Sequence, residues 1–228
     1  MTYSFLGWCL EVICKLISDH KFINRGFLIG PYCPIYGWGA LLMQLLLQKY
    51  LNDPLVLFIM IILLCSILEY FTSFYLEKLF HTRWWDYSNK KFNINGRICL
   101  ETMVPFGIFG MFLMYVANPF FLNLFNSWNE TFTIVLASIL VIGLLIDTII
   151  SFKMMNTFKN LCKNIEQKQI IPRDDTERIK KLVKKQIQTS KMRLEKRIMD
   201  AFPHLKIQTW NKTKKKKTKK ESCKLPRT

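Results

Sequence analysis

The sequence has no motif for binding a nucleotide and none of the common hydrolase motifs. Glycine is never followed by lysine, so the phosphate-binding loop GxxxxGK[ST] is absent, and neither GxSxG nor HExxH occurs. Only three histidines accompany the seven cysteines, and no two cysteines form a CxxC pair. We therefore expect buried apolar thiols, no metal site and no cofactor, and the chain cannot be its own P-loop ATPase.

Acidic residues are also scarce, and the excess of basic over acidic residues lies at one end of the chain. Residues 1–152 hold nine acidic and nine basic residues, whereas residues 153–228 hold seven and 24, so the second part carries the whole net charge of +17. This division excludes a secreted disulfide scaffold, a wholly soluble enzyme and a disordered chain. We expect a transmembrane domain over residues 1–152, a basic helical segment over 153–203 and a disordered lysine-rich tail over 204–228.

Five apolar segments predict an all-α fold, that of a polytopic helical membrane protein. A transmembrane helix needs about 20 mostly apolar residues. The segments are Tyr3–Ser18, Ile35–Leu47, Pro54–Phe80, Leu100–Ala117 and Phe132–Phe152. The first is short and contains Glu11 and Lys15, which could neutralise each other one turn apart, and the second is short unless it begins near Gly30.

Basic residues predict the orientation of these spans, because cytoplasmic loops retain Lys and Arg. The loops after the first and third spans hold seven basic residues. On the other side of the membrane, the loop after the second span has only Lys49, and the predicted loop Asn118–Glu130 has none. We therefore expect the N-terminus outside and the C-terminus in the cytoplasm.

The basic end of the chain has two parts. Apolar residues at helical spacing predict a basic amphipathic helix that begins near Pro172 and ends at Pro203. This helix could pack on itself, on a second copy or on anionic lipid, and the pattern leaves these alternatives open. The lysine run from Lys212 to Lys220 favours anionic lipid over a specific nucleic acid, since no nucleic-acid-binding signature accompanies it.

Ionisable residues inside the spans are the main candidates for function, because each costs on the order of a few kcal/mol unless it is paired or solvated. At about 1.5 Å per residue, five carboxylates fall in the inner half of the bilayer and none falls in the outer half. They are Glu11, Glu69, Glu77, Glu101 and Asp147. Glu69 and Asp147 have no partner within one turn of their own helix, so we expect Arg25, Arg83 and Arg97, from the inner loops, to be the partners of these two.

The two inner loops have an unusual composition. Residues 24–39 read NRGFLIGPYCPIYGWG, which favours a re-entrant segment or half-helix that ends at Pro34. Residues 81–101 read HTRWWDYSNKKFNINGRICLE, whose aromatic residues suit an interfacial belt and whose polar residues lie beneath the carboxylates. The sequence assigns no catalytic residue. The predicted substrate-binding set is Glu11, Arg25, Glu69, Glu77, Arg83, Asp86, Asn95, Arg97, Glu101 and Asp147.

The run NRGFLIGPYCPIYGWG, followed by EYFTSFYLEKLFHTRWWDYSNKKFNINGRICLE, resembles the CmpB-like family of ABC-transporter permeases (type IV). The resemblance covers about residues 4–150 and leaves the basic end outside it. It implies a protein of the bacterial cytoplasmic membrane that moves an unknown substrate with a separate ATPase chain. Because five spans are few for such a permease, it also implies a homodimer or a pair with another permease.

Three kinds of function stay open at this point. A transport component would line a path with Glu11, Glu69 and Asp147 and dock an ATPase through the second inner loop. A membrane-embedded enzyme or binder of a lipid-like or amphipathic substrate at the cytoplasmic leaflet would use Glu69 or Asp86 as general base and two loop arginines for an anionic head group. A non-catalytic scaffold would use its basic tail on lipid or on partner proteins, and the charged residues would only hold the spans together.

Overall fold

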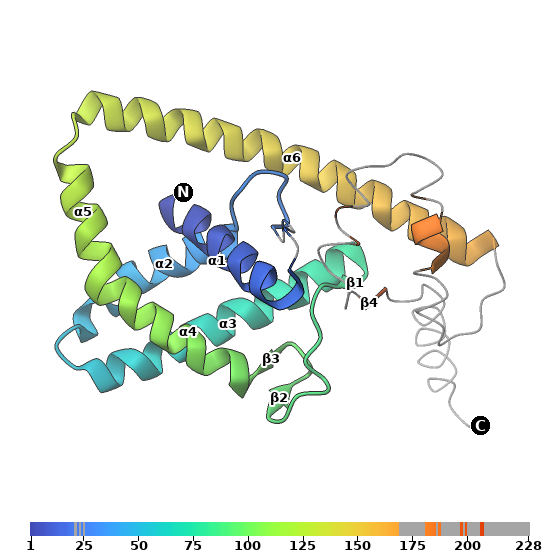
Figure 1. The fold of residues 1–228 in the computed structure, drawn as a ribbon, viewed down its shortest axis with the longest axis horizontal. Helices are drawn as coiled ribbons and strands as arrows, with labels where there is room; N and C mark the ends of the chain where they lie inside the picture. Colours follow the sequence, from blue (N-terminus) through green and yellow to red (C-terminus); the bar gives the residue numbers. More distant parts are fainter. Residues whose placement is uncertain are drawn as a thin grey trace, which may run out of the picture. The chain divides into compact units, whose positions relative to one another are not determined.

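The computed structural model describes residues 1–20, 22, 24, 26–168, 181–185, 187, 197, 199, 206 and 207 (Figure 1). The chain divides into two units, of which the first is Met1–Phe74 with Asp86–Phe152 and the second is Tyr75–Trp85 with Lys153–Thr228. The described residues are mostly helical, which confirms the predicted all-α class. The lysine run and most of the predicted amphipathic helix lie outside the described residues.

Each of the five predicted spans contains a helix. These helices are α1 Thr2–Asp19, α2 Pro34–Leu47, α3 Pro54–Phe80, α4 Leu100–Phe112 and α6 Glu130–Lys168. Three short helical elements are η1 Gln48–Tyr50, the π-helix η2 Leu113–Ala117 and α5 Asn118–Asn126. Four two-residue strands are β1 Thr82–Arg83, β2 Asn93–Ile94, β3 Ile98–Cys99 and β4 Lys206–Ile207. In the second unit β1 pairs with β4.

In the described part of the chain, three helical stretches are long and apolar enough to cross a membrane. They are Pro54–Phe80, Leu100–Asn126 and Glu130–Ile165. By contrast, α1 contains three charged residues and α2 has only 14 residues. The structure therefore confirms a helical membrane protein, while the count of about five spans stays a prediction.

The fourth span extends further than the sequence predicted. We expected a loop from Asn118 to Glu130, but η2 and α5 continue the helix to Asn126. Pro119 lacks a backbone N–H and usually breaks a helix, yet here it follows the π-helix, whose widened turn leaves room for it. The connection to α6 is therefore only three residues, 127–129.

The helices α3 and α4 approach each other closely because glycine lies at their contact. A Cβ atom at Gly107 would lie 2.6 Å from Cε2 of Phe58 and 2.8 Å from Cγ1 of Ile62, and a Cβ atom at Gly110 would meet Ile61. Small residues permit such close packing between membrane helices. The neighbouring core joins α2, α3 and η2 and comprises Met43, Leu47, Leu57, Ile61 and Met114.

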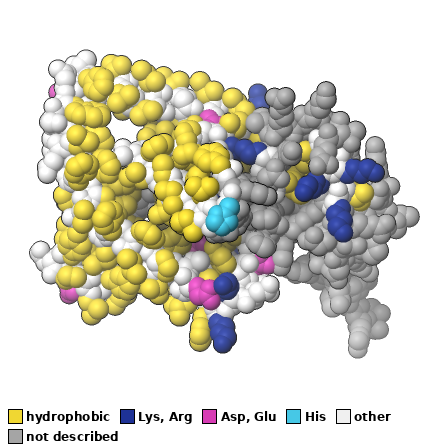
Figure 2. Space-filling model, in the orientation of Figure 1, with side chains coloured by type: hydrophobic (Ala, Val, Ile, Leu, Met, Phe, Trp, Pro, Cys, Tyr) yellow, Lys and Arg dark blue, Asp and Glu magenta, His cyan; other side chains and the backbone are white. Residues whose placement is uncertain are grey.

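The helix α3 has one polar side and one apolar side around Glu69. Large apolar residues recur as exposed side chains at every fourth position, namely Leu55, Ile59, Leu63, Ile67, Phe71, Tyr75 and Leu79. On the other side Ser66, Glu69 and Ser73 are buried. Lipid suits the apolar side, whereas the polar side must face protein. Figure 2 shows that hydrophobic side chains cover most of the visible described surface.

Residues Asp86–Cys99 form a hairpin, which we call the inner hairpin. Its strands β2 and β3 are antiparallel, with Ile94 opposite Ile98. Between them Asn95 and Gly96 have φ values of 52° and 65°, and the N–H of Arg97 donates to the carbonyl of Ile94 at 3.0 Å. Two positive φ values define a type I′ turn, for which Asn-Gly is the preferred pair.

Candidate functional site

Glu69 is the most constrained of the predicted site residues. Its side chain lies on the polar side of α3, and the residue is only 7% exposed. One carboxylate oxygen, Oε1, accepts a hydrogen bond from the Tyr87 hydroxyl at 3.3 Å, while the other, Oε2, is buried and has no hydrogen-bond partner among the residues that the structure describes. Buried polar atoms are almost always satisfied, and an ionised carboxylate is costly to bury with one weak bond. An available acceptor of this kind marks a site for a donor or a cation.

Tyr87 is held in place by the inner hairpin. Its backbone N–H donates to the carbonyl of Gly96 at 2.8 Å, which fixes the residue across from the turn. Burial, followed by the negative charge of Glu69 and a hydrogen bond to it, raises the pKa of Tyr87. The hydroxyl therefore keeps its proton at neutral pH and acts as a donor to the carboxylate.

Glu11 has a second tyrosine as its partner. The Tyr36 hydroxyl donates to Oε1 of Glu11 at 2.8 Å. The geometry follows from the close packing of α1 on α2, because a Cβ atom at Gly7, one turn before Glu11, would collide with the ring of Tyr36. The hydroxyl of that ring then reaches the next turn of α1, where Glu11 lies.

The two carboxyl–tyrosine pairs lie within electrostatic range of each other, because the negative charge of Glu11 adds to the larger effects of burial and of Glu69 that raise the pKa of Tyr87. We call Glu11, Tyr36, Glu69 and Tyr87 the carboxyl–tyrosine cluster. Two carboxylates whose charges repel each other attract a proton or a cation. Within the described residues no group of three or more His, Cys, Asp or Glu side chains could hold a metal ion.

Arg97 contacts the polar side of α3 at Ser73, which is one helical turn after Glu69. The residue is 8% exposed, and its Nη1 donates to the Ser73 hydroxyl at 3.1 Å. Its guanidinium carbon is 5.6 Å from the ring centre of Tyr70 and 5.5 Å from that of Phe74, which are cation–π distances. From the same turn Asn95 donates to the Tyr70 hydroxyl at 3.1 Å. The inner hairpin thus covers the polar side of α3 with two residues of the predicted set.

Four neutral hydrogen-bond donors hold the carboxylate of Asp147. Its carboxylate accepts hydrogen bonds from the N–H of Ile29 at 3.1 Å, the N–H of Gly30 at 2.7 Å and the Tyr32 hydroxyl at 2.7 Å. Ser151, one turn on, donates at 3.1 Å. We expected a loop arginine as its partner, but among the described residues backbone amides and hydroxyls take that place. Asp147 therefore fastens the first inner loop to α6.

The first inner loop is not the half-helix that the sequence predicted. Residues 26–33 form bends, and Pro34 begins α2 instead of ending a helix. Proline suits the first helical position, where its missing N–H leaves no hydrogen bond unmade. Arg25, a predicted site residue in this loop, lies outside the described residues.

The other predicted site residues have partners that do not belong to the carboxyl–tyrosine cluster. In the second unit Nε of Arg83 and Oε2 of Glu77 form an ion pair at 3.1 Å. In the first unit Lys90 and Glu101 form an ion pair at 2.7 Å in which both side chains are more than half exposed. Asp86 accepts hydrogen bonds from the backbone N–H and the hydroxyl of Ser88. These contacts stabilise the local chain, and exposed ion pairs contribute little free energy.

Sequence reasoning missed the tyrosines. We assigned Tyr87 to an interfacial belt and gave Tyr36 no role, although both donate to span carboxylates. The spacing of Ser66, Glu69 and Ser73, at three and four residues, was a readable signal for a buried polar side of α3.

The contact of Tyr32 with Asp147 predicts a loss of stability at alkaline pH. Burial, then the hydrogen bond and the charge of Asp147, raise the pKa of Tyr32 from 10.0 to about 12. A raised pKa means that the folded state favours the protonated hydroxyl, so this stabilisation is complete below pH 10 and is lost as the pH rises to about 12. Melting temperatures of the wild type and Tyr32→Phe, measured from pH 8 to pH 12, should therefore converge above pH 10. A constant difference up to pH 12 would contradict the role given to this hydroxyl.

Comparison with known proteins identifies the family. The family model ABC_trans_CmpB, described as "Putative ABC-transporter type IV", matches residues 1–152. The chain belongs to this family. The match confirms the resemblance carried by the two inner loops and ends at Phe152, before the basic end of the chain. No curated protein and no solved structure matches the chain.

Proposed function

We propose that this chain is the membrane component of an ABC transporter in a bacterial cytoplasmic membrane, working with a separate ATPase chain. Its membership of the family and its three membrane-length helices support this role. The predicted topology, with the N-terminus outside and the C-terminus in the cytoplasm, would put the inner hairpin on the side where ATP is available.

The substrate path, in this proposal, passes the carboxyl–tyrosine cluster. The observation that carries this part is the buried Oε2 of Glu69, an acceptor with no hydrogen-bond partner in the described part of the chain. A substrate group that donates hydrogen bonds or carries positive charge would satisfy this oxygen and offset the cost of burying the carboxylate. Glu11 would add a second acceptor. Asp147 is outside this path, since four hydrogen bonds already hold it.

A second copy of the chain would complete the path. The most apolar window of α6 has no residue buried by the rest of the described chain. In a permease with few spans, such a helix is available to line a shared path or to face lipid. This supports the homodimer, or the pair with another permease, that the family resemblance implied.

The inner hairpin is the proposed contact with the ATPase. Just before β2, Phe92 is 80% exposed and follows the exposed Lys90 and Lys91, and within β2 Ile94 is 53% exposed. An exposed aromatic residue beside positive charge, on a hairpin fixed by a type I′ turn, is a suitable docking element.

The docking proposal predicts that Phe92→Ser weakens binding of the ATPase. The full chain, tagged and purified from its native membrane in mild detergent, should retain a companion chain with vanadate-sensitive ATP hydrolysis. We expect Phe92→Ser to reduce the retained companion about tenfold, since a buried aromatic anchor contributes about 1–2 kcal/mol or more at an interface. The measurement is quantitative mass spectrometry of the purified complex.

The matched control is Phe120→Ser on α5. Phe120 is 61% exposed but lies near the end of the span that we predict to face outward. The Phe120→Ser variant should therefore retain the same amount of the companion chain as the wild type. Purification of the wild-type chain with no nucleotide-hydrolysing companion would contradict the transporter proposal, and equal losses for both variants would contradict docking by the hairpin.

One arrangement also favours a membrane-embedded enzyme or binder acting on a lipid-like substrate at the cytoplasmic leaflet. Glu69 with Tyr87 is a carboxylate–hydroxyl pair, and Arg97 contacts Ser73, one helical turn after Glu69. Such a pair could move a proton while an arginine orients an anionic head group. Conversion of a lipid by the purified chain without any nucleotide would favour this function over transport.

Contact of the lysine-rich tail with anionic lipid stays a prediction, because the tail lies outside the described residues.

A further inference from the structure

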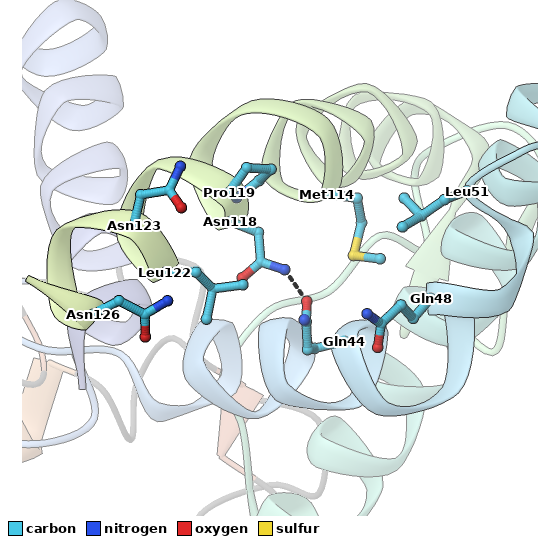
Figure 3. Close-up of a pocket in the computed structure, with 9 residues that line it drawn as sticks. All are labelled: Gln44, Gln48, Leu51, Met114, Asn118, Pro119, Leu122, Asn123 and Asn126. Atoms are coloured by element: carbon cyan, nitrogen blue, oxygen red, sulfur yellow. Dashed lines mark hydrogen bonds between the residues drawn. The ribbon is translucent and has the colours of Figure 1, made fainter.

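The first unit contains a cavity of about 330 Å³ that shares no residue with the carboxyl–tyrosine cluster. It lies between α2 with η1 on one side and η2 with α5 on the other (Figure 3). Its volume is at the lower end of the range for small-molecule sites. In the predicted topology this end of the helices faces outward, on the opposite side of the bilayer from Glu69.

The lining is rich in carboxamides and has no charged side chain. Five of its nine residues are amides, and apolar residues such as Met114 and Leu122 supply the remainder. The amides are Gln44, Gln48, Asn118, Asn123 and Asn126. Figure 3 shows Asn118, Leu122 and Met114 pointing from one helical segment toward Gln44 and Gln48 on the other.

Two of these amides hold the helices together, and the other three are available. Asn118 donates from Nδ2 to Oε1 of Gln44 and accepts from the Tyr3 hydroxyl at 3.1 Å. The structure records no side-chain hydrogen bond from Gln48, Asn123 or Asn126 to any residue that it describes. Each amide offers two donors and an acceptor oxygen, so the cavity presents both kinds of group to a ligand.

The backbone beside the cavity is also unusual. The π-helix η2 ends immediately before Asn118, and single π-helical turns are frequent at functional sites. The Tyr115 hydroxyl, from the same turn, donates to the carbonyl of Leu51 at 2.7 Å and fixes the turn against the end of α2 and η1. Two hydrogen bonds, Asn118–Gln44 and Tyr115–Leu51, therefore join the two sides of the cavity.

We propose that this cavity binds an uncharged, hydroxyl-rich group: a sugar or polyol that is either free or the head group of a glycolipid. Hydroxyl groups donate and accept hydrogen bonds, as the carboxamides do, and the C–H faces of a sugar ring fit the apolar part of the lining. An ion is disfavoured, because no charged side chain in the lining would compensate for its desolvation. This inference does not depend on the transporter proposal.

The test uses the full chain in nanodiscs of phosphatidylethanolamine and phosphatidylglycerol, purified in a detergent without a sugar head group. One arm titrates radiolabelled maltose, and the other adds digalactosyldiacylglycerol to the nanodisc and detects it by native mass spectrometry. Binding of maltose identifies a free sugar as the source, and binding of the glycolipid alone identifies a head group. The double variant Asn123→Leu/Asn126→Leu should bind about tenfold more weakly at an unchanged melting temperature, because two hydrogen bonds to the ligand are lost.

The control on the same helix is Leu124→Asn, since Leu124 lies between the two asparagines and is not part of the lining. It should bind as the wild type does. If the double variant fails to fold, Gln48→Leu replaces it with the same expected loss. The proposal is overturned if neither probe binds, or if binding is undiminished in the lining variants.

Discussion

Glu69→Gln should remove most of the activity of this protein while leaving its fold intact. Glutamine keeps the shape of the side chain and an acceptor for the Tyr87 hydroxyl, but it removes the negative charge. If Oε2 binds a cationic or hydrogen-donating substrate group, the lost bond is charge-assisted and contributes about 1.5–3 kcal/mol, which corresponds to about a 10- to 100-fold loss.

The measurement compares metabolite and lipid profiles of cells that carry each variant as the only copy. We expect the Glu69→Gln profile to match that of cells lacking the protein, while the purified complex still contains its companion. Glu130→Gln is the matched control, because Glu130 is an exposed carboxylate in the first turn of α6, away from the cluster. Its profile should match the wild type.

Stability separates a functional carboxylate from a structural one. A neutral amide is cheaper to bury than a carboxylate with one hydrogen bond, so Glu69→Gln should melt at the same temperature as the wild type or higher. A residue that only held the spans together would show the opposite, since breaking a buried ion pair is strongly destabilising. A lower melting temperature together with wild-type profiles would therefore rule out the proposed site.

The sequence predicted the helices well because their signal is local. Apolar runs located a helix in each of the five predicted segments, three of which lie in helical stretches of membrane length, and charge within the runs singled out Glu11, Glu69 and Asp147 as residues that need an explanation. The end of the fourth span was wrong. Asn118 and Pro119 normally indicate a loop, but the preceding π-helix accommodates the proline and the helix continues.

The tyrosine partners of Glu11 and Glu69 and the loop donors to Asp147 could not be predicted, because they come from other parts of the chain. On grounds of charge, we expected an arginine as the partner of Asp147. Among the described residues, the backbone N–H groups of Ile29 and Gly30 donate hydrogen bonds to its carboxylate. Backbone N–H groups can stabilise an anion as effectively as a positively charged side chain can. The spacing of residues in the sequence does not reveal where these N–H groups point. The inner hairpin was different, since the Asn-Gly pair at 95–96 was a readable turn signal that we did not use.

Gly107→Leu should separate α3 from α4 and prevent correct folding. The first added atom would already lie 2.6 Å from Phe58 and 2.8 Å from Ile62, and leucine adds three more carbon atoms at that contact. Overpacking typically costs about 1–3 kcal/mol and more where the neighbours cannot move, and we expect at least 3 kcal/mol here because both neighbours are side chains packed between helices. The measurement is the melting temperature in detergent, with the monodisperse fraction on size exclusion as a second readout.

Gly143→Leu is the matched control, because the same substitution falls on α6 at a position where an added Cβ atom has nothing within 4 Å. It should melt as the wild type does, so that any difference from Gly107→Leu reports the α3–α4 contact and not the loss of a glycine. Wild-type melting of Gly107→Leu would contradict this packing. If Gly143→Leu keeps its melting temperature but loses a dimer that the wild type forms, the exposed membrane part of α6 is the surface that meets the second copy, which is what a permease with few spans requires.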